Sequence, residues 1–273
     1  MATDTKIIGI SLVRNEDLFL DRAIANAVDF CDHLYVAEHR SRDRTADIAQ
    51  AWAKRDSRVS YHAISHPRES HDLIAPYAST PTWIFAVDGD ELYDPTGLKE
   101  FRQQILSGRY DEYWRIIGNV LNCTQLDREA GRAQGYFAPP SRSIVKLYNF
   151  GAIVRWDEVP EERLHEGRLV FKSGFDEKRQ LLLHEQVPWD HSIFRCLHVC
   201  FLPRSSTDKP DASRPKTRWN LADQYSRGPL VRALSKACNT FGIALPSGWK
   251  QERYCRGELV TCDVKNFFLS GTR

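Results

Sequence analysis

The chain has 273 residues, of which 42% are hydrophobic and 27% are charged, and its net charge is +2 at pH 7. This composition is ordinary for a folded globular protein and argues against long disordered tracts. The charges are too evenly balanced for the broad positive field of a nucleic-acid-binding protein, so we expect no nucleic-acid partner.

The cysteines and the opening residues indicate the compartment. The seven cysteines are widely spaced and form no C-x-x-C pair, which favours a reducing, cytoplasmic environment. The first residues lack the order of basic, apolar and small residues that marks a signal peptide. No apolar run approaches the ~20 residues that span a bilayer. We therefore expect a cytoplasmic protein without a transmembrane segment, and leave peripheral membrane association and homo-oligomer formation open.

The first hundred residues alternate between strand and helix patterns. The apolar run at 7–13 predicts a buried parallel strand, and apolar residues at helical spacing follow it. Strands are expected at 7–13, 34–37, 59–61 and 83–87. Helices are expected at 20–31 and 45–54, and a third helix is expected shortly before residue 83. A fourth helix should begin at Pro95, with Asp94 as its cap. Such alternation predicts a parallel sheet, whose ligands bind outside the carboxyl ends of the strands.

After residue 110 the pattern changes to strands separated by polar loops, which predicts a mixed or antiparallel second half. Strands are expected at 113–121, 143–148, 168–172 and 181–184. Residues 204–215 have the composition of a mobile loop, and helical patterns follow at 217–227 and 229–238. We therefore expect one domain over 1–205, with halves 1–110 and 111–205, and a loop with a helical C-terminal extension over 206–273.

The acidic motif Asp88-Gly89-Asp90-Glu91 follows the apolar run at 83–87. Two carboxylates separated by a glycine, which lets a ligand approach, suit a hard cation such as Mg²⁺ or Mn²⁺. Such an ion neutralises a substrate diphosphate and stabilises it as a leaving group. A D-x-D motif alone is a weak signal with an acidic turn as its alternative, but its place after a strand favours a functional site.

Several segments resemble family 2 GT-A glycosyltransferases. These are VRNE at 13–16, EHRSRDRT at 38–45, WIFAVDGDE at 83–91, SIVKLYN at 143–149, LHEG at 164–167 and LHVCF at 197–201. The resemblance spans about residues 6–205 and is strongest in the first hundred. It implies a GT-A (Rossmann-like) α/β fold with a mixed, mostly parallel sheet flanked by helices. It also implies transfer of a sugar, with inversion, from a nucleoside-diphosphate sugar donor to a carbohydrate or other hydroxyl acceptor.

The resemblance also implies roles at the metal. Asp90 would bind the ion directly, Asp88 would face the donor ribose or a metal-bound water and so shares the metal site, and His198 would complete it. A histidine in an apolar strand is as often a core residue, and His191 is then the nearest substitute.

At the donor, the resemblance implies that residues 12–15 contact the nucleotide base, while Glu16 caps the following helix. At Glu38-His39 the sequence departs from the two aspartates usual in the family, which leaves the base open. Arg68 is a candidate for binding phosphate. The expected donor-binding residues are Leu12, Val13, Arg14, Asn15, Glu38, His39, Arg68, Asp88 and Gly89.

Inverting transfer needs a general base that removes the proton of the acceptor hydroxyl. Glu166 is the first candidate because it matches a landmark of the family, with Asp157 and Glu158 as alternatives. Trp156 and Trp189 are candidate sugar platforms, since an aromatic face covers the apolar side of a pyranose, and core packing is the alternative for both.

The sequence alone also leaves other functions open. In a haloacid-dehalogenase-like phosphatase, Asp88 would be a nucleophile and Asp90 an acid/base, but Glu91 stands where that class has Thr or Val, and no later Asp-Asp pair follows. A sugar nucleotidyltransferase would need a Gly-rich phosphate loop after the first strand, which this sequence lacks. A catalytically inactive, sugar-binding GT-A protein is the non-enzymatic alternative.

Overall fold

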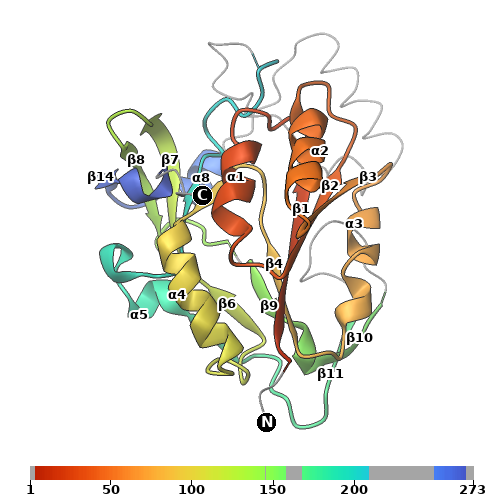
Figure 1. Cartoon of the computed structure of the whole chain (residues 1–273). Helices are drawn as coiled ribbons and strands as arrows, with labels where there is room; N and C mark the ends of the chain where they lie inside the picture. Colours follow the sequence, from red (N-terminus) through yellow and green to blue (C-terminus); the bar gives the residue numbers. More distant parts are fainter. Residues whose placement is uncertain (1–3, 145, 158–167, 209–248, 269–273) are drawn as a thin grey trace, which may run out of the picture.

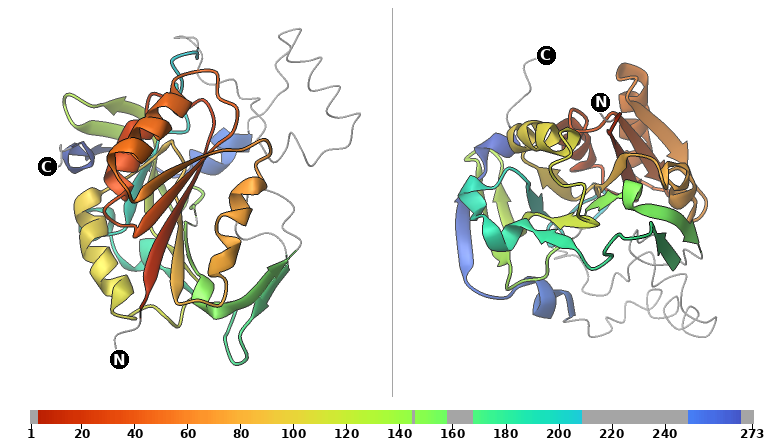
Figure 2. Two further views of the ribbon diagram at one scale, coloured as in Figure 1. Left: turned by 45° about the vertical axis from the view of Figure 1, so that its right-hand side comes forward. Right: turned by 90° about the horizontal axis from the view of Figure 1, so that it is seen from below.

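The computed structural model describes residues 4–144, 146–157, 168–208 and 249–268 of the chain. Within these ranges the strands form a seven-stranded sheet, a five-stranded sheet and a two-stranded ribbon (Figure 1). The five-stranded sheet and the ribbon lie at opposite sides of the molecule, with the seven-stranded sheet between them (Figure 2).

The seven-stranded sheet has the order β12-β6-β9-β4-β1-β2-β3. Its strands are β1 (Lys6–Val13), β2 (His33–Glu38), β3 (Val59–Ala63), β4 (Thr82–Ala86), β6 (Arg115–Ile117), β9 (Leu147–Asn149) and β12 (Gln180–Leu182). Strands β1 to β4 pair in parallel, as do β6 and β12, whereas β9 runs antiparallel to β4 and β6. The predicted α/β fold with a mixed, mostly parallel sheet is confirmed.

Helices cover this sheet because its strands are apolar on both faces. Side chains alternate along β1, so Ile7 and Val13 pack on one face with α1 (Leu20–Ala27), α2 (Thr45–Arg55) and α4 (Pro95–Leu106). On the other face, Ile8 and Ile10 pack against Ile74, which follows α3 (Glu69–Asp72). A strand buried on both sides reads as a continuous apolar run, which is why β1 was predictable.

The helix that leads away from the acidic motif begins as predicted. Asp94 is its N-cap, and its Oδ1 accepts hydrogen bonds from the backbone N–H groups of Thr96 (3.0 Å) and Gly97 (3.3 Å). Pro95 occupies the first helical position, where no N–H is needed. The cap fixes where the chain turns after β5 (Glu91–Tyr93) and therefore holds the acidic motif in place.

The five-stranded sheet has the order β14-β8-β7-β13-β5. Besides β5, its strands are β7 (Asn119–Asp127), β8 (Arg132–Ala138), β13 (Arg195–His198) and β14 (Leu259–Asp263). The single strand expected at 113–121 is wrong, because the chain leaves β6 at Gly118 and enters β7 in the other sheet. A Cβ at Gly118 would lie 2.3 Å from the backbone oxygen of Phe194, so this crossing requires glycine.

The remaining elements lie after residue 150. Strands β10 (Ile153–Asp157) and β11 (Arg168–Phe171) form the antiparallel ribbon. The strand expected at 181–184 ends at Leu182 and continues as the short helix α5 (Leu183–Gln186). Of the helices in the described ranges, none combines the length and the apolar character that crossing a membrane requires.

The C-terminal region differs from the expected helical extension. Residues 249–268 contain α8 (Trp249–Tyr254), but also β14, which pairs antiparallel with β8 along its whole length. This part of 206–273 therefore completes the second sheet, because an edge strand leaves backbone groups unpaired until a partner covers it. The helices expected at 217–227 and 229–238 lie outside the described residues.

Candidate functional site

A cluster of charged side chains lies where the two sheets meet, at the carboxyl end of β4. The chain leaves β4 at Ala86, turns through Asp88, Gly89 and Asp90, and enters β5 at Glu91. The backbone N–H of Glu91 donates to the carbonyl of Asp88 at 3.1 Å and closes this turn. The acidic motif therefore joins the seven-stranded sheet to the five-stranded one.

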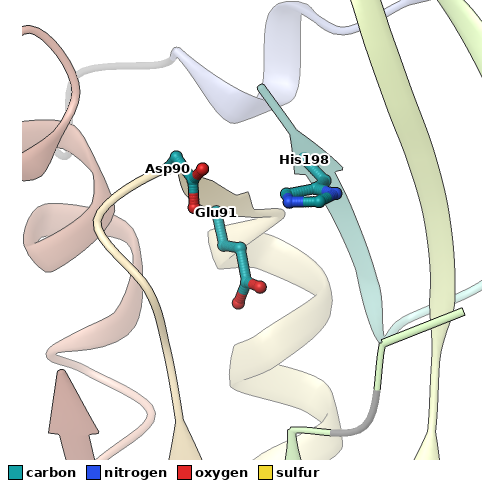
Figure 3. Close-up of side chains that lie close together, drawn as sticks. All are labelled: Asp90, Glu91 and His198. Carbon is teal, nitrogen blue, oxygen red and sulfur yellow. The ribbon is translucent and has the colours of Figure 1, made fainter. Parts of the chain in front are cut away.

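Three potential metal ligands meet beside this turn. One ligand atom from each of Asp90, Glu91 and His198 lies within 4.8 Å of the other two, and all three residues are buried. Asp90 and Glu91 come from the turn and the start of β5, and His198 from the end of β13 (Figure 3). Glu91 and His198 are directly paired residues of antiparallel strands, which places their side chains on the same face of the sheet. Asp88, Asp90 and His198 were predicted as ligands, but Asp88 is not one of the three clustered residues, and Glu91, which is, was not predicted.

The ring of His198 is oriented by a neighbouring strand. Its Nδ1 lies 2.9 Å from Oδ1 of Asn122, the residue beside it on β7. The Asn122 amide N–H groups point to the carbonyls of Tyr136 and Arg142, both at 3.5 Å, which turns the amide oxygen toward the ring. Nδ1 therefore carries the proton and Nε2 the lone pair, the arrangement usual for a metal-binding histidine.

Lys146 lies beside the same turn and was not predicted to take part. Its Nζ lies 2.6 Å from Oδ2 of Asp88 and 3.0 Å from Oε1 of Glu91. Burial by itself lowers the pKa of Lys146, but the carboxylates of Asp88 and Glu91 outweigh it, so the pKa is raised and the ammonium stays charged. The sequence signal was a single lysine within the otherwise mostly apolar run at 143–149.

A second cation, Arg204, reaches the other side of the turn. Its Nη1 lies 2.8 Å from Oε1 of Glu16 and also contacts Oδ2 of Asp90. Burial raises the pKa of Glu16 to about 8, with the Arg204 guanidinium opposing that rise. Residue 204 was expected to begin a mobile loop, so its role at this site was missed.

Glu16 does not have the predicted position either. Its backbone carbonyl accepts the N–H of Leu20 at 3.0 Å, but its side chain turns away from α1 into the charged cluster. A Cβ at Gly89 would lie 2.3 Å from Oε2 of Glu16. A side chain at position 89 would therefore displace the Glu16 carboxyl from the charged cluster.

The charges of this group are suited to a divalent cation. Four carboxylates (Glu16, Asp88, Asp90 and Glu91) face two permanent cations (Lys146 and Arg204), so full ionisation leaves two negative charges in excess. Burial raises the pKa of the Glu91 carboxyl, and Lys146 opposes it. Two carboxylate oxygens and one imidazole nitrogen are donors that Mn²⁺ accepts, and Mg²⁺ also binds carboxylates. The residues present therefore fit the ion that the motif predicts.

The expected donor-binding loops lie at the carboxyl ends of β1 and β2. Leu12 is half-buried and Val13 is fully buried, and both belong to β1. Asn15 has a φ of 53°, and it links the two loops. Its N–H donates to Oγ of Ser41 (3.0 Å), and its Oδ1 accepts the N–H of Arg42 (2.8 Å). Arg14 precedes this link and is half-buried.

Glu38 and His39 are buried and already have partners inside the protein. Glu38 accepts the N–H of Ser41 at 2.5 Å and the hydroxyl of Tyr61 at 3.4 Å. Nε2 of His39 lies 3.1 Å from the carbonyl of Ser65, and burial followed by the charge of Arg14 lowers the pKa of His39. These contacts shape the loop after β2, so a donor contact from Glu38 would have to share its carboxylate. Arg68 is exposed at the start of α3.

The candidates for the catalytic base are only partly described. Asp157 is the last residue of β10, and its backbone pairs with Arg168 of β11. Glu158 and Glu166 lie outside the described residues. The identity of the base therefore stays a prediction. His191, the substitute for His198, is exposed in a short 3-10 helix and is not among the three clustered ligands.

Both candidate sugar platforms are buried. Trp156 is 9% exposed and packs against the rings of His71 and Phe150. Trp189 is 6% exposed and stacks on Phe267 with 6.0 Å between ring centroids. Their packing supports the alternative of core residues, because a platform must present its face to the ligand.

The chain has only low sequence identity to the solved structures that it resembles. No family model matches the chain, and a search of curated proteins finds no match. Among solved structures, it is similar to S. aureus TarS 1-349, with 12% identity over 70% of this chain and 60% of that one (TM-score 0.38). S. aureus TarS 1-349 in complex with UDP is 13% identical over 71% of this chain and 60% of that one, with a TM-score of 0.39. S. aureus TarS is 14% identical over 72% of this chain and 37% of that one, also with a TM-score of 0.39. The chain thus spans 60% or less of the length of each of these proteins.

Proposed function

We propose that this protein is a glycosyltransferase that uses Mn²⁺ or Mg²⁺, held by Asp90, Glu91 and His198, to transfer a sugar from a nucleoside-diphosphate donor to a hydroxyl acceptor. The observation that carries the proposal is the meeting of these three ligand atoms within 4.8 Å, at the end of a parallel sheet. Two of the three were expected from the D-x-D motif and the family resemblance. This edge of an open α/β sheet is where ligands bind.

The residues around the predicted metal site would have different roles in the reaction. A bound cation would offset the charge of the donor diphosphate and so make it a better leaving group. Asn122 would keep the lone pair of His198 on Nε2, and Lys146 would hold the side chains of Asp88 and Glu91 in place through its two ion pairs. The side chain of Asp88 is 45% exposed, which suits its predicted contact with the donor ribose or a metal-bound water.

Inversion requires a base on the acceptor side, and Glu166, Asp157 and Glu158 are our candidates in that order. We infer a nucleoside diphosphate from the D-x-D motif and the family resemblance of the sequence, and the divalent cation alone would offset the two excess negative charges of the carboxylates.

Thermal-shift measurements with UDP, GDP, CDP and dTDP, each with and without Mn²⁺, test the proposal. A ligand that binds only the folded state raises the melting temperature, so one nucleotide should do so in a metal-dependent way. Asp90→Asn should remove that shift and lower the transfer rate by about 10²–10³-fold, as expected for the loss of a group that stabilises transition-state charge.

Asp29→Asn is the matched control, since the side chain of Asp29 is 69% exposed and pairs with Arg58, whose side chain is outside the charged cluster. It should leave both readouts unchanged. Full transfer activity in Asp90→Asn would disprove the proposal. So would the absence of any nucleotide shift together with hydrolysis of phosphate esters, which is the behaviour of the phosphatase alternative.

A further inference from the structure

Arg204 binds the same aspartate that the metal would need. Its side chain is only 18% exposed, and its Nη1 is shared between Oδ2 of Asp90 and Oε1 of Glu16. The two partners come from the turn before β5 and from the turn before α1, whereas Arg204 lies more than a hundred residues further along the chain. In the described structure, a protein cation therefore occupies one oxygen of a predicted metal ligand.

The segment that carries Arg204, which we call the strap (residues 204–208), is anchored independently of the guanidinium. The N–H of Leu18 donates to the carbonyl of Arg204 at 3.0 Å. Ser206 donates its N–H (2.7 Å) and its hydroxyl (2.5 Å) to the carboxylate of Asp17. The hydroxyl of Ser205 donates to Asp43 at 2.6 Å. The strap therefore stays in place if the Arg204 side chain changes partners.

A divalent cation and the Arg204 guanidinium compete for the carboxylate of Asp90. Each needs the carboxylate as an electron-pair donor, and the two positive charges repel each other strongly in a buried site. Glu16 offers the same nitrogen of Arg204 a second carboxyl oxygen at 2.8 Å, so the guanidinium keeps a partner after it leaves Asp90. The exchange thus needs only a movement of one side chain.

We propose that Arg204 is an internal counter-ion, which holds Asp90 in the metal-free protein and is exchanged for the divalent cation when the donor binds. This inference rests on the proposed function. Arg204 then weakens the binding of metal alone, while the negative diphosphate of the donor offsets the repulsion between the ion and the guanidinium. Metal and nucleotide therefore bind with positive coupling, and Arg204 is the positioning residue that produces it.

Titration of the full chain with Mn²⁺, followed by the electron paramagnetic resonance signal of the free ion, tests this proposal without measuring activity. Arg204→Gln should bind Mn²⁺ about tenfold more tightly than the wild type in the absence of nucleotide. The gain in Mn²⁺ affinity on adding the nucleotide chosen by thermal shift should shrink by the same factor, because Arg204 no longer competes for Asp90 once the nucleotide is bound and the affinity in that state should be unchanged.

Arg128→Gln is the matched control. Arg128 lies near the same end of α1, where it donates to the carbonyl of Leu18 and covers the ring of Phe19, and it has no carboxylate partner among the described ion pairs. This variant should bind Mn²⁺ as the wild type does. Unchanged or weaker Mn²⁺ binding by folded Arg204→Gln would overturn the proposal, since it would make Arg204 a support for Asp90 and no competitor.

Arg204→Lys is the second variant, because removal of a buried cation can prevent folding. It keeps the charge, so its Mn²⁺ affinity should stay within about threefold of the wild type, and a tenfold gain would overturn the proposal. The failure of the proposed function looks different. In that case wild type and Asp90→Asn bind Mn²⁺ alike, whereas failure of the counter-ion proposal alone leaves the Asp90 dependence intact.

Discussion

The two cations beside the acidic turn are held in different ways. Lys146 lies next to the start of β9, where its carbonyl accepts the N–H of Ala86 at 2.7 Å, so the seven-stranded sheet fixes it next to the turn. Arg204 is carried by the strap, outside both sheets, and is held by side chains of the loops after β1 and β2. The difference indicates that Lys146 is a permanent part of the site, whereas Arg204 is free to exchange its partner.

Replacement of Lys146 should have the largest effect on stability. Lys146→Met keeps an unbranched side chain that is one atom shorter, but leaves Glu91, which is 1% exposed, without its cation. Removing one partner of a buried ion pair costs about 3–5 kcal/mol, and we expect a loss of that size in the free energy of unfolding. Urea denaturation in the absence of metal measures it.

The control for this prediction is Lys265→Met, since Lys265 pairs with Asp263 through side chains that are both 65% exposed. It should change the free energy of unfolding by less than about 1 kcal/mol. If Lys146→Met proved equally mild, or increased Mn²⁺ affinity as Arg204→Gln should, the distinction between the two cations would fail.

The buried carboxyl of Glu16 should make the free energy of unfolding depend on pH. Burial, opposed by Arg204, raises the pKa of Glu16 from 4.5 to about 8, so the folded protein holds a proton that the unfolded chain has released between these values. The free energy of unfolding therefore falls as pH rises from 4.5 to 8, by at most about 1.4 kcal/mol per pH unit. Glu16→Gln should flatten this dependence in metal-free urea titrations. A slope identical to that of the wild type would contradict it.

A substitution in the strap should have the smallest effect of these on the free energy of unfolding. Ser206→Ala removes the hydroxyl donated to Asp17 but keeps the backbone N–H at 2.7 Å, so we expect a loss of about 1–3 kcal/mol in the free energy of unfolding. Mn²⁺ affinity should stay unchanged, because Arg204 still reaches Asp90 from an anchored strap. Urea denaturation and the Mn²⁺ titration check both statements. A tenfold change in Mn²⁺ affinity would show that strap and guanidinium move together.

Much of the fold was open to prediction from the sequence. Strands β1, β2 and β4 are short and mostly apolar, and β1 and β2 are followed by amphipathic helices, so their local patterns report their burial directly. The strands of the second sheet are harder, since β14 (LVTCD) alternates between exposed and half-buried residues and gains its role only by pairing with β8. Its place depends on a partner more than a hundred residues away, which no local pattern contains.

The site divides in the same way. The sequence by itself determined that Asp88 and Asp90 follow an apolar strand, and that Asp94 caps the next helix, because both depend on neighbours within a few residues. Only the tertiary structure decided that Glu91 joins Asp90 and His198, and that Lys146 and Arg204 balance them. The tertiary structure also decided that the Glu38 carboxylate accepts a hydrogen bond from Ser41 in the loop after β2. Register and packing bring distant charges together, and burial then makes their pairing matter, since an unpaired charge away from water is costly.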